Sequence, residues 1–180
     1  RYGYQHLYRY DYNGKLLSQI TQGNWDVMTV ESLDPVADLL YYTSTEASGL
    51  ERHLYSIRLN GSNKRKITEE AGLHQIQFAP GGKYFIDTWS NLNTPRQTEI
   101  RSVDGTLIKS WQTNENVKTF IKTHVYAPKM LDHISTTSGL NLDVYIIKPI
   151  DFDSSKKYPL ILNIYGGPGA QSVYNSWGGN

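Results

Sequence analysis

The sequence predicts a mainly β protein in two parts, in which the C-terminal blades of a β-propeller are followed by the first strands of an α/β domain. Three observations predict this. Fourteen tyrosines, two methionines and no long helical periodicity favour strands over helices. A repeat organises the first two thirds of the chain, and a short apolar run near residue 160 ends in a glycine-rich turn.

The repeat is built of short strands and tight turns. His6-Leu7-Tyr8 recurs as His53-Leu54-Tyr55, Asn13-Gly14 as Asn60-Gly61, and Ile20-Thr21 as Ile67-Thr68, each 47 residues further on. Asn-Gly pairs tolerate the positive φ angles that tight hairpin turns require. A four-stranded unit that recurs about every 40 to 50 residues is typical of a propeller blade.

A second repeated unit lies between these copies. Residues 31–44 have the pattern of strand, turn and strand, residues 76–88 repeat it, and residues 99–111 form a further hairpin around Asp104-Gly105. Residues 1–118 are therefore predicted to hold two blades and a further fraction. Because known propellers close with at least four blades, we expect earlier blades to precede this segment. A β-sandwich with hairpins that are alike by chance is the alternative.

Composition excludes several classes of partner. Eighteen basic and seventeen acidic residues give a net charge of +1 without runs of like charge, so we expect neither a nucleic-acid partner nor membrane contact through a polybasic surface. No segment approaches the roughly 20 apolar residues of a membrane helix. The lack of cysteine removes disulfides, thiol catalysis and cysteine-ligated zinc.

Histidines and aromatic residues are assigned mainly to structure. The five histidines have no metal-ligand spacing, so neither a metal nor a cofactor is predicted, and Asp132 with His133 is expected to be a solvated pair on a hairpin. Six aromatic residues are expected to pack between blades: Tyr41, Tyr42, Tyr84, Phe85, Trp89 and Trp111.

The second predicted domain covers residues 119–180. Residues 129–149 should form a hairpin that turns at Ser138-Gly139, and a polar loop follows at 151–157. The continuous apolar run that ends at Tyr165 fits a fully buried strand of a large mixed sheet.

Tyr165 precedes the turn Gly166-Gly167-Pro168-Gly169. Glycines there would let the backbone and a ligand approach closely. A phenol at the end of a buried strand can donate a hydrogen bond to the alkoxide that forms when a carbonyl is attacked. On position alone, a buried tyrosine bonded to the backbone is the simpler interpretation.

Two motifs resemble one known family. Residues 158–169 resemble the first core strand of the catalytic domain in prolyl oligopeptidase-type serine peptidases, particularly the dipeptidyl peptidase IV branch. Gly23-Asn24-Trp25-Asp26-Val27 is similar to the G-x-W-E/D-V segment of that branch's late blades. The resemblance covers essentially the whole chain, in the order of last propeller blades, connecting hairpin and first strand of a truncated α/β-hydrolase domain, so residues 119–180 are identified with a linker and the N-terminal strands of that domain. It implies that Tyr165 helps to form the oxyanion hole and that Gly166, Gly167 and Pro168 form the supporting turn.

Ser176 superficially matches a G-x-S-x-G-G nucleophile elbow. Tyr174 stands where the first glycine is needed, and Ser176 follows Tyr165 by only eleven residues, too few for a helix and another strand. Ser176 is therefore not expected to be the nucleophile. The resemblance places the catalytic serine, aspartate and histidine after Asn180, and the glutamates that bind the substrate's amino terminus before Arg1.

The resemblance implies an internal segment of a serine exopeptidase that releases N-terminal dipeptides of the Xaa-Pro or Xaa-Ala type by acyl transfer, inactive alone because the triad is missing. It also implies peptide substrates, a homodimer of the full-length protein, and a periplasmic, secreted or membrane-anchored location. Two alternatives stay open. One is a stand-alone propeller binding module with a C-terminal docking arm, which would need an exposed, polar segment at 158–169, whereas the actual segment is apolar. The other is an acylaminoacyl peptidase or oligopeptidase of the same family.

Overall fold

The computed structural model describes residues 3–164, 166–167 and 169–178. Its contacts divide the chain into two compact units. The first comprises Arg1–Asn114 with Asn175–Asn180, and the second comprises Glu115–Tyr174. The predicted domain boundary after residue 118 stays a prediction.

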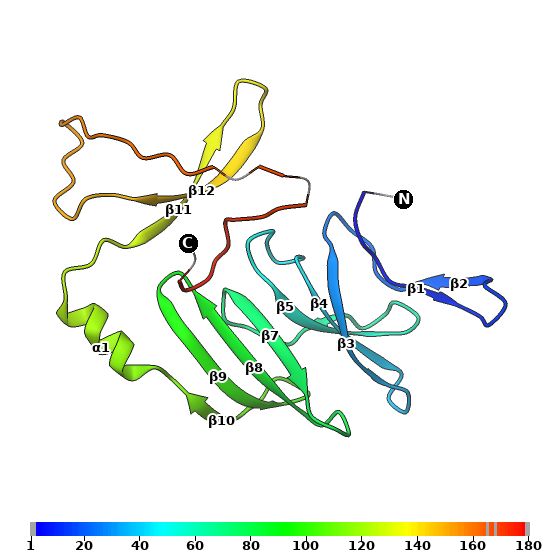
Figure 1. Cartoon of the computed structure of the whole chain (residues 1–180). Coiled ribbons are helices and arrows are strands. Elements are labelled where there is room, and N and C mark those ends of the chain that lie inside the picture. The colour runs from blue at the N-terminus through cyan, green and yellow to red at the C-terminus, as the bar shows by residue number, and fades with distance from the viewer. Residues whose placement is uncertain (1–2, 165, 168, 179–180) are drawn as a thin grey trace. The chain divides into compact units, whose positions relative to one another are not determined.

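The first unit contains two antiparallel four-stranded sheets, drawn as two separate twisted fans in Figure 1. One sheet has the order β3 (Val27–Asp34), β4 (Leu39–Ser44), β5 (His53–Arg58) and β6 (Arg65–Lys66). The other has the order β7 (Leu73–Phe78), β8 (Tyr84–Asn91), β9 (Thr94–Ser102) and β10 (Leu107–Gln112). The hairpin of β1 (Tyr8–Tyr10) and β2 (Leu16–Gln19) precedes them.

This arrangement confirms the predicted mainly β fold with propeller blades. Each sheet follows the chain from strand to neighbouring strand, as expected for a blade. The hairpin predicted at 99–111 is the outer half of the second blade. The further fraction of a blade is the β1–β2 hairpin.

The sequence repeat extends to the backbone hydrogen bonds. The Ile20 N–H donates to the Leu7 carbonyl, and 47 residues later the Ile67 N–H donates to the Leu54 carbonyl, both at 2.8 Å. The repeated tripeptides therefore occupy the same place in successive outer hairpins.

The two blades are also joined through their backbones. Arg52 and Leu73 form an isolated parallel bridge. The Arg52 N–H donates to the Gly72 carbonyl at 3.1 Å, and the His74 N–H donates to the Arg52 carbonyl at 3.0 Å. This junction brings the start of β5 to the start of β7.

Strand β4 contributes to two apolar cores because its side chains alternate between the faces of the sheet. Tyr42 packs in a cluster with Ile20, Val27, Leu40, Tyr55 and Ile57. Tyr41 packs in another with Leu54, Ile67 and Phe85, which joins the first blade to the second.

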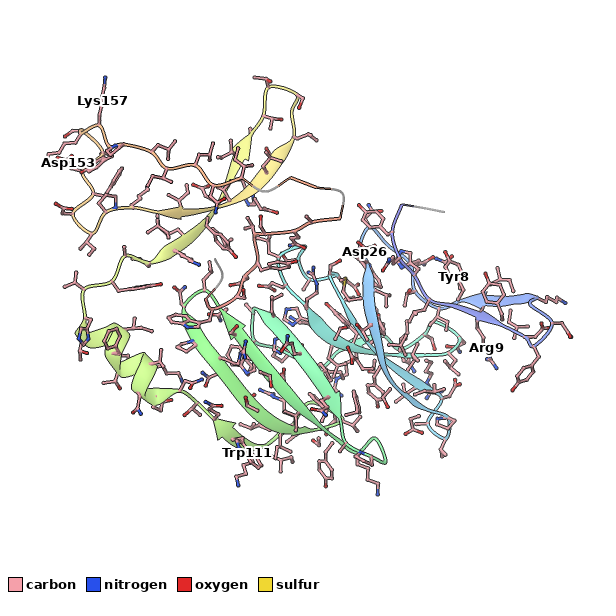
Figure 2. All side chains as sticks on the ribbon, viewed as in Figure 1. Tyr8, Arg9, Asp26, Trp111, Asp153 and Lys157 are labelled. Carbon is pink, nitrogen blue, oxygen red and sulfur yellow. The ribbon has the colours of Figure 1, made fainter. Side chains whose placement is uncertain are left out.

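Four of the six aromatic residues expected in the core are buried: Tyr41, Tyr42, Phe85 and Trp89. The prediction is wrong for Tyr84 and Trp111, which are 48% and 69% exposed. Tyr84 precedes the buried Phe85 on β8 and so faces the opposite side. Trp111, labelled in Figure 2, lies on β10, the last strand in its sheet.

The second unit contains α1 (Glu115–Thr123), β11 (Lys129–Ser135) and β12 (Asn141–Ile147). β11 and β12 form the predicted hairpin, and the Gly139 N–H closes its turn on the Thr136 carbonyl at 3.0 Å. The sequence did not predict α1. Glu115 in its first turn and Lys122 in its last turn complement the helix dipole.

The strand predicted at 159–165 is not formed by the described residues 159–164, where Leu160 and Ile161 are 85% and 94% exposed. A buried strand of a mixed sheet needs a hydrogen-bonding neighbour on each side. Within the described part of this unit the two strands, β11 and β12, pair with each other. The apolar run therefore lacks the sheet in which the pattern would be buried.

Gly105 in the β9–β10 turn lies against the first blade. It has a φ of +94°, and a Cβ atom added there would lie 2.7 Å from the Ile67 carbonyl oxygen. Gly14 in the β1–β2 turn has a φ of +80°, and nothing lies within 4 Å of such a Cβ. The two turns share a positive φ at glycine but differ in packing.

We expect Gly14→Ala to lower the free energy of unfolding by about 1 kcal/mol, because alanine is strained at positive φ. Gly105→Ala should cost about 1–3 kcal/mol more, because its methyl group would also press on Ile67. Urea unfolding followed by tryptophan fluorescence measures the difference. Equal losses in the two variants would contradict the close contact between the blades.

Candidate functional site

The predicted oxyanion turn is only partly within the described residues. Tyr165 and Pro168 lie outside them, while Gly166 and Gly167 are described and exposed. The role of the Tyr165 hydroxyl therefore stays a prediction, together with that of its supporting turn.

Ser176 lies between two residues held by the blades. The Asn175 N–H donates to the Leu50 carbonyl at 2.9 Å, and the Trp177 N–H donates to Ser90 Oγ at 3.2 Å. Each of the five histidine rings has another partner, so none of them activates Ser176. The pairs are His6 with Thr21, His53 with Thr68, His74 with Asp87, His124 with the Phe120 carbonyl and His133 with Asp143.

Glu51, His53 and Thr68 have the composition of a catalytic triad. Glu51 Oε2 lies 3.0 Å from His53 Nε2, and His53 Nδ1 lies 3.0 Å from Thr68 Oγ1. Thr68 Oγ1 also accepts the Leu54 N–H at 3.1 Å, so its own proton is free to bond His53 Nδ1. His53 is then a neutral ring that donates from Nε2 to the Glu51 carboxylate.

Burial excludes a catalytic role for this group, because His53 and Thr68 are both 0% exposed and no substrate can reach the hydroxyl. The repeat contains a second copy in which His6 Nδ1 lies 3.2 Å from Thr21 Oγ1. There the Gly23 carbonyl replaces the carboxylate, at 2.9 Å from His6 Nε2. We call this histidine–threonine bond the blade strut.

The second blade has a different hydrogen bond at the position that corresponds to the blade strut. Gln97 lies 44 residues after His53, and Thr113 lies 45 residues after Thr68. The Gln97 Nε2 atom donates to the Thr113 carbonyl at 3.0 Å. A polar side chain that forms a hydrogen bond is thus kept at this position although the residue changes.

Burial lowers the pKa of His53, and the nearby His74 and Lys66 lower it further. The hydrogen bond and the charge of Glu51 act in the opposite direction but do not outweigh these effects. His53 is therefore held in its neutral form.

His74 and Asp87 form an ion pair whose side chains are both 0% exposed. The Asp87 oxygens lie 2.9 and 3.0 Å from His74 Nδ1, and the Glu70 carbonyl lies 2.8 Å from His74 Nε2. Both ring nitrogens face acceptors, so both carry hydrogen. His74 is thus an imidazolium, and its ring centroid lies 4.9 Å from that of the neutral His53.

Arg101 extends this charged group across the second blade. Its Nε and Nη2 atoms donate to Glu99 Oε2 at 2.9 and 2.7 Å, and Nη2 donates to Glu70 Oε1 at 3.0 Å. The Arg101 Nε atom also lies 4.0 Å from Asp87 Oδ2. Two cations therefore share three carboxylates.

The pKa values of Arg101 and Glu70 reflect this pairing. Burial alone would lower the pKa of Arg101, but the bonds and charges of Glu99 and Glu70 raise it. Burial alone would raise the pKa of Glu70, but a backbone hydrogen bond and Arg101 lower it. Both groups are held in their charged forms.

The buried ion pair of His74 and Asp87 was not predicted from the sequence. One signal was present for the blade strut, since His6 to Thr21 and His53 to Thr68 share a spacing of fifteen residues. No such repeat marks His74 and Asp87, which meet because β7 and β8 pair Ile76 with Asp87 and His74 with Trp89.

A solvated pair was expected between Asp132 and His133, but the partner of His133 is Asp143. His133 Nδ1 lies 2.8 Å from Asp143 Oδ1 on the neighbouring strand, and the two side chains are 64% and 42% exposed. Asp132 instead accepts the backbone N–H of His133 at 2.8 Å. Cross-strand register selects Asp143, because it stands directly opposite His133.

Among the described residues, no group of three or more His, Cys, Asp or Glu side chains could hold a metal ion. In the same part of the chain, no helix combines the length and apolar character needed to cross a membrane.

Two complete antiparallel blades, joined by buried polar side chains and preceded by a matching outer hairpin, define this chain as part of a β-propeller protein. Comparison with known proteins identifies the family. Residues 1–96 match the family described as the dipeptidyl peptidase IV (DPP IV) N-terminal region, and the chain belongs to that family.

Curated relatives match nearly the whole chain. A probable dipeptidyl-aminopeptidase B from Tuber melanosporum is 31% identical over 97% of the chain, which corresponds to 20% of that relative. A dipeptidyl peptidase 4 from Arthroderma otae is 31% identical over 97% of the chain and 23% of its own length.

A solved structure agrees with these matches. The crystal structure of Porphyromonas gingivalis dipeptidyl peptidase 4 is similar with a TM-score of 0.92 and 32% identity, over 98% of this chain and 25% of that one. The chain thus spans about a fifth to a quarter of the length of these relatives.

We expect Asp87→Asn to lower the free energy of unfolding by about 3–5 kcal/mol, because it leaves the buried His74 and Arg101 with too little negative charge. The matched control is Asp143→Asn in the exposed pair with His133, for which a loss of about 1 kcal/mol or less is expected. Chemical unfolding of both variants tests this. Similar small losses would show that the buried pair is not a charged one.

His53 should make the protein less stable in mild acid. Its pKa is lowered in the folded state, so the unfolded chain binds the proton more tightly, and stability should fall as pH drops below about 6.5. His53→Gln should reduce the loss of stability between about pH 7.5 and pH 5.5, since this side chain no longer titrates. Thermal unfolding at both pH values measures the loss, and an unchanged pH dependence in the variant would contradict the prediction.

Proposed function

We propose that this chain is a segment of a serine exopeptidase that releases dipeptides from the amino terminus of peptides, of the Xaa-Pro or Xaa-Ala type. The observation that carries the proposal is family membership, together with relatives named dipeptidyl peptidases over 97% of the chain. The names of these relatives favour this branch over an acylaminoacyl peptidase or an oligopeptidase.

The proposed reaction is acyl transfer. A serine attacks the scissile carbonyl, a histidine takes its proton, and an aspartate orients the histidine. The chain's own contribution is the Tyr165 hydroxyl, which would donate a hydrogen bond to the oxyanion, with Gly166, Gly167 and Pro168 as the supporting turn. The triad would belong to another part of the longer protein, so the chain alone would be inactive.

The apolar residues 160–164 support this assignment. They are exposed in the described structure although Leu160, Ile161, Leu162 and Ile164 are suited to burial. A hydrolase sheet that supplies neighbouring strands would bury them and hold Tyr165 at the strand's end. A stand-alone binding module with a docking arm would need polar residues in this segment, and the apolar run disfavours it.

We expect Tyr165→Phe in the full-length parent to lower kcat for Gly-Pro and Ala-Pro chromogenic substrates by about a hundredfold or more, with KM largely kept. The lost hydrogen bond would act mainly in the transition state.

Tyr158→Phe is the matched control, because Tyr158 lies seven residues before Tyr165 and its hydroxyl accepts the Asp153 N–H at 2.9 Å. Its kcat should stay close to that of the native protein. An unchanged kcat in Tyr165→Phe would make Tyr165 a packing residue. A parent that cleaves neither substrate would favour the binding module.

A further inference from the structure

Asn175 forms hydrogen bonds with both blades. Its backbone N–H donates to the Leu50 carbonyl at 2.9 Å, and its side-chain Nδ2 donates to Glu51 Oε1 at 2.7 Å. Its Oδ1 accepts the N–H of Leu92, which lies between β8 and β9, at 3.1 Å. We call these three bonds the Asn175 clamp. They link the loop before β5 in the first blade to the β8–β9 turn in the second.

Glu51, which accepts the Asn175 side-chain bond, is held in place independently of Asn175. Glu51 uses its other oxygen, Oε2, to accept from His53, and His53 is fixed in turn by the blade strut to Thr68. His53 and Thr68 are fully buried. An acceptor oriented in this way costs little ordering entropy when Asn175 binds it.

The clamp lies where the chain re-enters the blade unit. The chain leaves this unit after Asn114 and returns to it at Asn175. The preceding residue, Tyr174, belongs to the other unit, where its N–H donates to the Tyr145 hydroxyl at 2.6 Å and its carbonyl accepts from that hydroxyl at 2.5 Å. Two consecutive residues are therefore each held by a different unit.

The clamp is also close in sequence to the predicted oxyanion turn. Five residues, 170–174, separate Gly169 from Asn175. Once Asn175 is fixed, a tether this short limits how far the turn can lie from it. Positioning to within a fraction of an ångström decides how well an oxyanion donor works.

We propose that Asn175 is a positioning residue for the peptidase reaction, which it serves by fastening the chain just after the oxyanion turn to Glu51 and Leu92 of the two blades. This inference rests on the proposed function. Asn175 does not touch the substrate. It acts through the turn that carries Tyr165.

The test uses the full-length parent with Asn175→Ala and, as a matched control, Asn116→Ala, which changes an exposed asparagine on α1. Active sites are counted with a fluorophosphonate, so that kcat refers only to molecules with a working nucleophile. We expect Asn175→Ala to lower kcat per titrated site by about ten- to a hundredfold, with KM for a Gly-Pro chromogenic substrate within about twofold of native. Asn116→Ala should match the native protein.

Glu51→Gln provides a second variant. His53 and Asn175 bond different oxygens of Glu51, and a glutamine would place an NH₂ group in one of these two positions, so it cannot accept both bonds in the same geometry. Its kcat per titrated site should fall as in Asn175→Ala, and the double variant should lose little more, because both changes break the same clamp.

The outcomes are distinguishable. A lower fraction of titrated sites with native kcat per site in Asn175→Ala would mean that Asn175 serves stability alone, and would overturn the proposal. Additive losses in the double variant would show that Asn175 does not act through Glu51, and would also overturn it. If the native parent does not cleave the substrate, the proposed function fails first, and this inference fails with it.

Discussion

The two blades meet across polar side chains that are buried without access to water, so each donor needs an acceptor within the protein. The blade strut meets this requirement at His53, and the Gln97 side chain meets it in the second blade by donating to the Thr113 carbonyl. In the two histidine copies, the threonine hydroxyl bonds the ring and also accepts the N–H of the residue that follows the histidine. A single pair of side chains thereby fixes both the hairpin and the loop that leads to the next blade.

The charged groups around the blade strut compensate one another. His53 and His74 lie close together, and two adjacent buried cations would repel each other strongly. The difficulty is avoided because His53 stays neutral, while His74 is charged and compensated by Asp87. Arg101 with Glu99 and Glu70 extends the compensation. The junction is thus held by hydrogen bonds and compensated charges, and through His53 it orients Glu51, which accepts from Asn175.

The sequence was informative wherever a local pattern repeats. The 47-residue spacing located both blades and the outer hairpins, since hairpin turns and alternating strands are encoded by adjacent residues. The spacing of the repeat could not show which polar residues meet across strands. His74 and Asp87 are thirteen residues apart, and only the β7–β8 register brings them together. Trp111 was assigned to the core because its type favours burial, whereas its position on an edge strand exposes it.

The candidate site was predicted less completely for a related reason. The apolar run before Tyr165 has the composition of a buried strand, but a strand forms only where neighbouring strands supply hydrogen bonds. The Asn175 clamp has no signal in the sequence at all, because Asn175 and Glu51 are 124 residues apart. Contacts of such sequence separation follow from the fold and cannot be read from spacing.

The proposed role of this chain is to supply an oxyanion donor to a serine exopeptidase. A structure of the full-length parent with a dipeptide boronate bound covalently to its nucleophilic serine tests this role. We expect the Tyr165 hydroxyl to lie within about 2.6–3.2 Å of the boronate oxygen that mimics the oxyanion. A Tyr165 hydroxyl bonded to the protein backbone, with the boronate oxygen held by other donors, would contradict it.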